Sequence, residues 1–217
     1  MKINNLLLII QQSPYLTKQN LSLVLRREGE ALNYWVKKLI RDKTLIPLKK
    51  GFYVSSYYGN FVSQTPKDRE LYGEYLANIL RYPSYVSLEY VLAKYNFIPE
   101  APFAITCVTV KSPRVYSSSF GDFIYRSVKE DLFFGWEVKD FRGKEVRVAS
   151  LPKALFDFLY LKKLPIEQWQ NYLLAEGRFN WKIFRQKEKT KFAQFTRNSR
   201  NKKMVEILNI LRQGKIL

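Results

Sequence analysis

The sequence predicts an α+β fold in two parts: three helices followed by a β-hairpin, then a mixed part with a mostly antiparallel sheet flanked by helices. Three observations support this. Apolar residues recur at helical spacing in residues 30–43, and two short β-compatible runs around a glycine follow at once. Further on, short β-branched or aromatic runs are separated by proline, glycine or charged turns, and helical spacing returns after residue 149.

Two helices are predicted before the amphipathic one. Residues 3–11 suit a first helix, which Ser13-Pro14 ends. Thr17 suits the N-cap of a second helix, and Gly29 allows the turn into the third. The apolar positions of the second helix are Leu21, Val24 and Leu25.

The third predicted helix, residues 30–43, has two distinct faces. Its apolar stripe consists of Leu32, Trp35, Val36, Leu39 and Ile40, all expected in the core. Its opposite face is polar and basic, with Asn33, Tyr34, Lys37, Lys38 and Arg41. The hairpin at residues 44–54 turns at Gly51, which can adopt the positive φ that a tight turn needs. Lys49 and Lys50 are expected at its tip.

A helix followed by a basic-tipped hairpin is the order of a winged helix-turn-helix, which binds double-stranded DNA. We assign this domain to residues 1–58. Asn33 can pair bidentately with adenine, whereas the lysines suit phosphate groups. The candidate DNA contacts are Arg26, Arg27, Asn33, Tyr34, Lys37, Lys38, Arg41, Lys49 and Lys50. The alternative is a solvated helix face with no ligand.

A second domain is predicted for residues 67–217, after a short polar linker at 55–60 and 64–66. Its helices are expected at 67–81, 87–96 (capped by Ser87), 151–161, 166–175, 181–195 and 201–213. Its strands are expected at 104–111, 114–118, 121–128, 133–138 and 145–149. Lys153 and Asp157 lie one helical turn apart, and we expect them on the solvent-exposed stripe of their helix.

The net charge of +18 is concentrated at the two ends of the chain. Residues 1–55 contain ten basic and three acidic residues, and residues 151–217 contain fifteen and five. Nucleic acid is the favoured partner, with an acidic protein or a membrane surface as the alternative. A possible second basic surface comprises Arg178, Lys182, Arg185, Lys189, Arg197 and Arg200. These residues fit a DNA, RNA or acidic-protein contact, or the solvated side of an amphipathic helix.

The missing residue types limit the chemistry. Without histidine, and with one cysteine, the chain has no residues for a Ser-His-Asp or Cys-His nucleophile, a zinc site or an internal disulfide. We expect no cofactor, no metal and a buried strand position for Cys107. No apolar run is long enough to cross a bilayer, so we expect a cytoplasmic protein without membrane contact.

Ordered motifs in the middle of the chain resemble a known family. They are Ser84-Tyr-Val-Ser-Leu-Glu89, Tyr95-Asn-Phe-Ile-Pro-Glu100, Ile105-Thr with Val108-Thr, Gly121-Asp-Phe-Ile-Tyr125, Phe134-Gly135, and Val148-Ala149 with Lys153-Ala-Leu-Phe-Asp157. In order and approximate spacing the chain is similar to the AbiEi family over most of residues 1–162. One departure lies just before Lys153: the family often has Pro-Glu-Lys-Ala-Leu where this chain has Leu151-Pro-Lys-Ala-Leu155, so the usual glutamate is missing.

This resemblance implies a function in phage defence by abortive infection. AbiEi proteins are the antitoxins of toxin-antitoxin systems and transcriptional repressors of their own operons. The resemblance therefore implies two partners: promoter DNA and a co-encoded nucleotidyltransferase-like toxin. A winged-helix regulator without a toxin is an alternative.

An enzymatic alternative rests on three residues. Asp122 followed by Glu137-Val-Lys139 fits the loose order of magnesium-dependent nucleases, in which two carboxylates hold the metal. Such matches are common by chance in a charged chain, and no phosphate-binding glycine loop is present. We therefore expect a non-enzymatic protein without catalytic residues.

Overall fold

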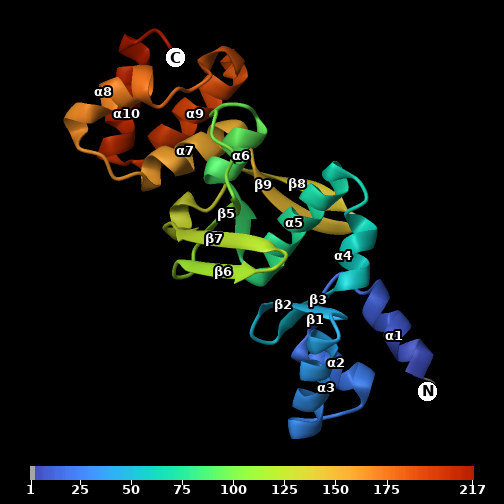
Figure 1. Cartoon of the computed structure of the whole chain (residues 1–217). Coiled ribbons are helices and arrows are strands. Elements are labelled where there is room, and N and C mark those ends of the chain that lie inside the picture. The colour runs from blue at the N-terminus through green and yellow to red at the C-terminus, as the bar shows by residue number, and fades with distance from the viewer. Residues whose placement is uncertain (1–2) are drawn as a thin grey trace.

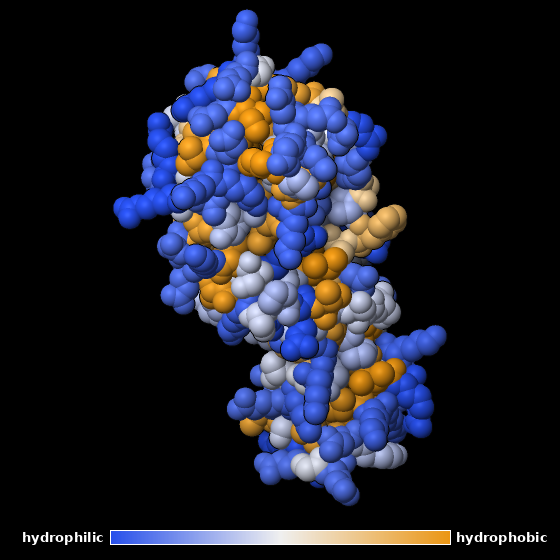
Figure 2. Space-filling view, turned by 90° about the vertical axis from the view of Figure 1, so that its left-hand side faces the viewer, coloured by the Kyte–Doolittle hydropathy of each residue, from blue (hydrophilic) through white to orange (hydrophobic). Residues whose placement is uncertain are grey.

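The computed structural model describes the backbone of residues 3–217 and the side chains from residue 8 onward. A small N-terminal unit, residues 3–55, lies below a larger C-terminal unit, residues 66–217, and helix α4 (Ser56–Val62) connects them (Figure 1). Figure 2 shows the narrowing between the two units, where hydrophobic residues reach the surface. Within residues 3–217, two sheets form and five of the seven strand pairings are antiparallel, which confirms the α+β class.

The N-terminal unit combines three helices with a three-stranded antiparallel sheet of order β1-β3-β2. Its elements are α1 (Ile3–Gln12), β1 (Leu16–Thr17), α2 (Lys18–Leu25), α3 (Gly29–Arg41), β2 (Leu45–Lys49) and β3 (Phe52–Ser55). The predicted cap is confirmed, because Thr17 Oγ1 accepts from the Asn20 amide at 3.1 Å and Asn20 Oδ1 accepts from the Thr17 amide. Gly51 turns the hairpin with φ 76°, also as predicted.

The core of the N-terminal unit confirms most of the predicted stripe of α3. Leu32, Val36 and Leu39 are buried against residues of α2 and the sheet. The prediction for Trp35 was wrong, because this side chain is half-buried and lies outside the core cluster. Its ring meets the ring of exposed Tyr34 edge-on, with centroids 6.2 Å apart. Trp35 lies at the margin of the apolar stripe, where α3 meets solvent.

Part of the predicted linker is helical. Ser55 caps α4 by accepting from the Tyr58 amide at 3.4 Å, and the helix then runs through residues expected to be irregular. Gly59 of α4 is buried, and the ring of Phe120 from the C-terminal unit lies beside it. Tertiary packing therefore stabilises a helix in a stretch whose polar residues and glycine predict none.

A six-stranded sheet of order β6-β7-β5-β4-β9-β8 forms the centre of the C-terminal unit. Its strands are β4 (Ser84–Val86), β5 (Ala104–Thr109), β6 (Arg114–Ser118), β7 (Gly121–Ser127), β8 (Trp136–Phe141) and β9 (Lys144–Ala149). The short central strand β4 was not predicted, and the strand expected at 133–138 begins three residues later. Cys107 is fully buried on β5, as predicted, and burial raises the pKa of its thiol.

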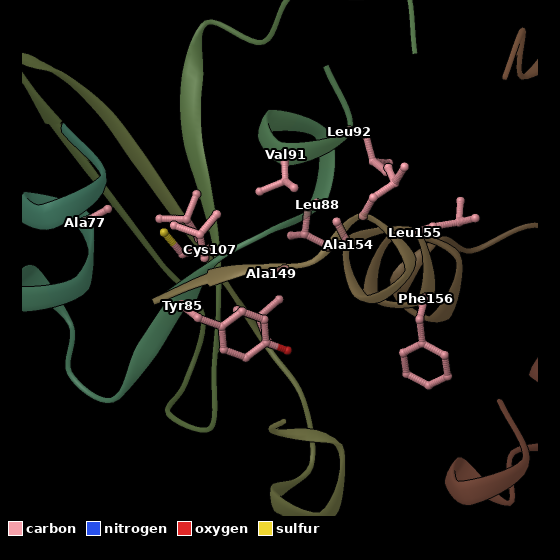
Figure 3. Packing of buried hydrophobic residues seen from close by; sticks show 14 of the residues in the cluster. Ala77, Tyr85, Leu88, Val91, Leu92, Cys107, Ala149, Ala154, Leu155 and Phe156 are labelled. Carbon is pink, nitrogen blue, oxygen red and sulfur yellow. The ribbon is translucent and has the colours of Figure 1, made fainter. Parts of the chain in front are cut away.

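The α-helices of this unit are α5 (Pro66–Leu80), α6 (Leu88–Lys94), α7 (Leu151–Leu161), α8 (Trp169–Asn171), α9 (Gln186–Ser199) and α10 (Lys202–Gln213). Short 3₁₀ turns lie at Glu130–Leu132, Ile166–Gln168 and Trp181–Ile183, and a π turn at Tyr172–Glu176. Figure 3 shows buried side chains of α6 and α7 packing together beside the sheet.

The helix predicted at 181–195 begins five residues later than expected. Trp181 is held by tertiary contacts instead: its indole N–H donates to the carbonyl of Leu173 at 3.1 Å. Its ring also meets buried Phe97 edge-on, with centroids 5.1 Å apart. These contacts leave only a 3₁₀ turn at Trp181, and α9 starts after the extended residue Arg185.

Candidate nucleic-acid interface

Four of the predicted DNA contacts are exposed on α3, namely Asn33, Tyr34, Lys37 and Arg41; Glu30 and Ala31 in its first turn are exposed as well. The four predicted contacts share one face because residues three or four apart are neighbours on a helix. Arg41 has a carboxylate nearby, with its Nε 3.6 Å from Asp42 Oδ1, but both side chains are well exposed. Such a surface pair is weak, so the Arg41 guanidinium can still bind an anion.

Lys38 belongs to the edge of this face rather than to its centre. The side chain is half-buried, and its Nζ lies 4.9 Å from the ring centroid of Trp35. This geometry is a cation–π contact. The half-buried Trp35 therefore positions the ammonium group of Lys38 beside the exposed face.

Two arginines lie in the turn that leads into α3. Arg26 adopts a left-handed conformation with φ 51°, and its amide donates to the carbonyl of Ser22. The hydroxyl of Ser22 in turn donates to the carbonyl of Arg27 at 2.8 Å. These backbone contacts fix the turn while the side chains of Arg26 and Arg27 stay exposed.

The two hairpin lysines, predicted as a pair at the tip, have different surroundings. Lys50 is exposed, but Lys49 points to the C-terminal unit, where its ammonium group donates to the carbonyl of Leu80. Lys49 Nζ also lies 5.4 Å from the ring centroid of Phe52 and 5.3 Å from that of Tyr116. A register shift in β2 between Pro47 and Lys49 accounts for the change in direction. Lys49 therefore joins the two units instead of standing free.

Further contacts join the two units. The rings of Tyr15 and Phe52 stack with centroids 4.9 Å apart, and Tyr15 also meets Tyr75 of α5. The hydroxyl of buried Tyr72 donates to the carbonyl of Pro14 at 2.6 Å. Aromatic packing and a buried hydrogen bond thus connect the N-terminal unit to α5.

Lys18 is a candidate that sequence reasoning missed. It is exposed at the start of α2, and its amide donates to the carbonyl of Gly51 at 2.9 Å. This contact brings Lys18 close to the hairpin turn that carries Lys50. No local pattern indicates this, because the two residues are distant in the sequence.

The six residues of the predicted second basic surface do not converge. Arg178 pairs with Glu100, and Arg197 and Arg200 lie at the far end of α9 from Arg185. Fifteen residues at about 1.5 Å each separate Arg185 from Arg200 by roughly 22 Å. Lys182 and Arg185, by contrast, line a cleft with two lysines that were not among the candidates, Lys187 and Lys191.

The structure separates the carboxylates of the nuclease alternative. Asp122 lies on β7 and Glu137 on β8, with β5, β4 and β9 between them. At about 4.8 Å per neighbouring strand, the two residues are on the order of 20 Å apart. Lys139 lies instead 4.0 Å from buried Glu74, and its pKa is lowered by burial, with nearby Lys94 adding to the effect and Glu74 opposing it. Asp122 and Glu137 therefore cannot hold one metal ion between them.

The prediction that Lys153 and Asp157 face solvent was wrong. Both side chains are fully buried, and Lys153 Nζ lies 2.8 Å from Asp157 Oδ1. Asp157 Oδ2 accepts hydrogen bonds from the hydroxyls of Tyr85 and Ser87, so Ser87 does not use its side chain to cap α6 as predicted. Burial raises the pKa of Asp157, although Lys153 and these hydroxyls oppose the rise.

Comparisons with known proteins leave the family open. A scan against protein-family models and a search of curated proteins gave no match. Of the helices in residues 3–217, none combines the length and apolar character that a membrane span requires.

Proposed function

We propose that the N-terminal unit is a winged helix-turn-helix that binds double-stranded DNA upstream of its own gene and represses transcription. The observation that carries this proposal is the exposed polar and basic face of α3, opposite its buried stripe. The element order of the unit, with helices followed by a β-hairpin, is compatible with α3 as the helix that enters the major groove.

The exposed residues fit different contacts with DNA. The amide of Asn33, in the first half of α3, suits the edge of an adenine, since it offers a donor and an acceptor together. Lys37 and Arg41 suit phosphate groups, and the hydroxyl of Tyr34 can donate a hydrogen bond to the sugar-phosphate backbone of the DNA. The candidates for flanking phosphate contacts are Lys18, Arg26, Arg27, Lys38 and Lys50. Lys49 is not included, because its ammonium group contacts Leu80.

A gel-shift titration tests this proposal. We expect the purified full-length protein to shift DNA from upstream of its own gene at least about tenfold more tightly than scrambled DNA of equal length, because base contacts add to the phosphate contacts. Magnesium is included, and a denaturing gel of the products detects cleavage. Equal affinity for the two DNAs would contradict a sequence-specific repressor.

We further propose, from the AbiEi resemblance, that the protein is an antitoxin that counteracts a co-encoded nucleotidyltransferase-like toxin. The arrangement of two units supports separate roles, because the exposed face of α3 belongs to the N-terminal unit alone. We assign the antitoxin role to the C-terminal unit. A toxin-free regulator remains the alternative if no such toxin is encoded beside the gene.

Separate roles predict that antitoxin activity survives loss of DNA binding. In cells that express the toxin from an inducible plasmid, a full-length Lys37→Ala, Arg41→Ala variant at wild-type protein level should restore growth as well as the unmodified protein. A Lys129→Ala, Lys144→Ala variant, which removes two exposed positive charges from the C-terminal unit, is the matched control. Failure of the α3 variant alone would assign both roles to the DNA-binding face.

A further inference from the structure

A cleft of about 450 Å³ lies in the C-terminal unit, away from α3. Its walls come from four segments that are distant in the sequence. They contribute Tyr95, Glu137, Ser150, Leu151, Pro152, Lys182, Ile183, Arg185, Lys187, Glu188 and Lys191. The volume lies in the range of small-molecule sites, which is about 300 to 1,000 Å³.

Positive charge dominates the wall formed by α9 and the turn before it. Four cationic side chains line the cleft, namely Lys182, Arg185, Lys187 and Lys191. Only two carboxylates, those of Glu137 and Glu188, are among the lining residues. Lys187 and Lys191 are four residues apart, so both project from one face of α9. Four cationic side chains around one small concave space favour an anion with several oxygen atoms, such as a phosphate group.

The opposite wall adds polar groups from the junction of β9 and α7, and α7 packs against α9 (Figure 1). Ser150 lines the cleft although its side chain is only 7% exposed, and its hydroxyl donates a long hydrogen bond of 3.3 Å to the carbonyl of Gly135. In the described part of the chain, neither Ser150 nor Arg185 caps its helix with its side chain. The first amides of α9 therefore receive no capping bond from Arg185 and can bind an anion, whereas Pro152 in the first turn of α7 has no N–H to donate.

Two further lining residues, Tyr95 and Glu137, suit the base and the sugar of a nucleotide in addition to its phosphate. Tyr95 is 41% exposed and lines the cleft, so its ring is available to stack on a base. The exposed carboxylate of Glu137 can accept hydrogen bonds from ribose hydroxyls, which an inorganic anion lacks. We propose that this cleft binds the phosphate of a nucleotide through Lys182, Arg185, Lys187 and Lys191, with Tyr95 stacked on the base. This site is independent of the DNA contacts of α3.

Calorimetric titration of the full-length protein at 150 mM salt tests the site with five probes: adenosine 5′-monophosphate, adenosine, inorganic phosphate, and an adenine RNA hexamer with and without a 5′-phosphate. We expect saturable one-to-one binding of the monophosphate and binding of adenosine that is about tenfold weaker or less, because the phosphate makes charge-assisted contacts. A free nucleotide is the ligand if the monophosphate binds as tightly as the phosphorylated hexamer. A strand end is the ligand if the hexamer binds more tightly and needs its 5′-phosphate.

Two variants with the same change in charge distinguish specific binding in the cleft from general attraction of a phosphate to a basic protein. Lys187→Gln with Lys191→Gln should weaken binding of the monophosphate by about tenfold or more, whereas Arg197→Gln with Lys202→Gln should change it less than about twofold. The control pair removes the same charge from exposed positions outside the cleft. Tyr95→Leu should weaken the nucleotide but not inorganic phosphate. Equal losses in the two charge variants, or no saturable binding of any phosphorylated probe, would overturn the proposal.

Discussion

Replacing Asp157 with asparagine should lower the free energy of unfolding by about 3 to 5 kcal/mol, because the change leaves the buried charge of Lys153 without its counter-ion. The effect is expected to be this large because both side chains are fully buried, with 2.8 Å between Lys153 Nζ and Asp157 Oδ1. Asparagine keeps the shape of the side chain and can still accept hydrogen bonds from Tyr85 or Ser87. The substitution therefore tests the charge rather than the packing.

The other groups around Lys153 compensate only in part for the loss of the Asp157 charge. Its ammonium group also donates to the carbonyl of Leu132 at 2.8 Å, and it lies 4.3 Å from the ring centroid of Phe134. A carbonyl and an aromatic ring stabilise a cation, but neither neutralises it. Without Asp157, Lys153 either remains charged in an apolar interior or loses its proton, and both outcomes destabilise the folded state.

Chemical denaturation of the variant and of two controls measures this effect. Thermal unfolding gives a second measurement: for a chain of this length, the melting temperature of the Asp157→Asn variant should fall by about 10 °C. Glu100→Gln breaks the exposed Arg178–Glu100 pair and should cost less than about 1 kcal/mol. Lys153→Met added to Asp157→Asn should recover part of the lost stability, because the unpaired charge is removed. A loss for Asp157→Asn as small as that for Glu100→Gln would contradict a strongly coupled buried pair.

The Lys153–Asp157 pair shows how far local sequence patterns can predict this protein. The spacing of four residues correctly places both side chains on one face of a helix, and the predicted bounds of α7 are confirmed. Whether that face meets solvent depends on segments elsewhere in the chain, among them the strand that carries Tyr85. A polar pair on an apolar helix usually indicates an exposed stripe, and here the tertiary fold buries it.

The difference between local sequence patterns and tertiary contacts also explains which other elements were predicted correctly and which were missed. Helices such as α3, α5 and α10 were predicted within one or two residues because their apolar periods are local, as are the side-chain caps of α5 and α10. Strand β4 was missed, since three residues are too few for a pattern and only pairing with β5 and β9 makes them a strand. The direction of Lys49 depends on a register shift in the hairpin, which composition does not indicate.

The cleft is a further case of non-local assembly. Lys187 and Lys191 could be placed on one helix face from their spacing, and Lys182 and Arg185 were already candidates. The opposite wall was not predictable, because Tyr95 and Ser150 reach the cleft from just after α6 and just before α7. The sequence therefore indicated the positive charge of this region but not the concave site that collects it.

Replacing Lys37 and Arg41 with alanine should weaken promoter binding by about 100-fold at moderate salt, since each loses a charge-assisted phosphate contact worth about 1.5 kcal/mol or slightly more. Both side chains are exposed on α3, opposite the buried stripe, so the variant should keep its stability. Gel shifts over a range of salt concentrations provide a second measurement. If both residues bind phosphate, the slope of log affinity against log salt concentration should fall in magnitude by about 2.

The Lys129→Ala, Lys144→Ala variant is the control for this experiment, because it reduces the net charge equally at exposed positions of the C-terminal unit. It should bind the promoter within about threefold of the unmodified protein, since remote charges act only through the screened long-range field. Asn33→Ala should behave differently from both, with weaker discrimination against base changes in the operator and an unchanged salt slope. Equal losses for the α3 variant and the control would mean that general charge drives binding, and α3 would not be the recognition helix.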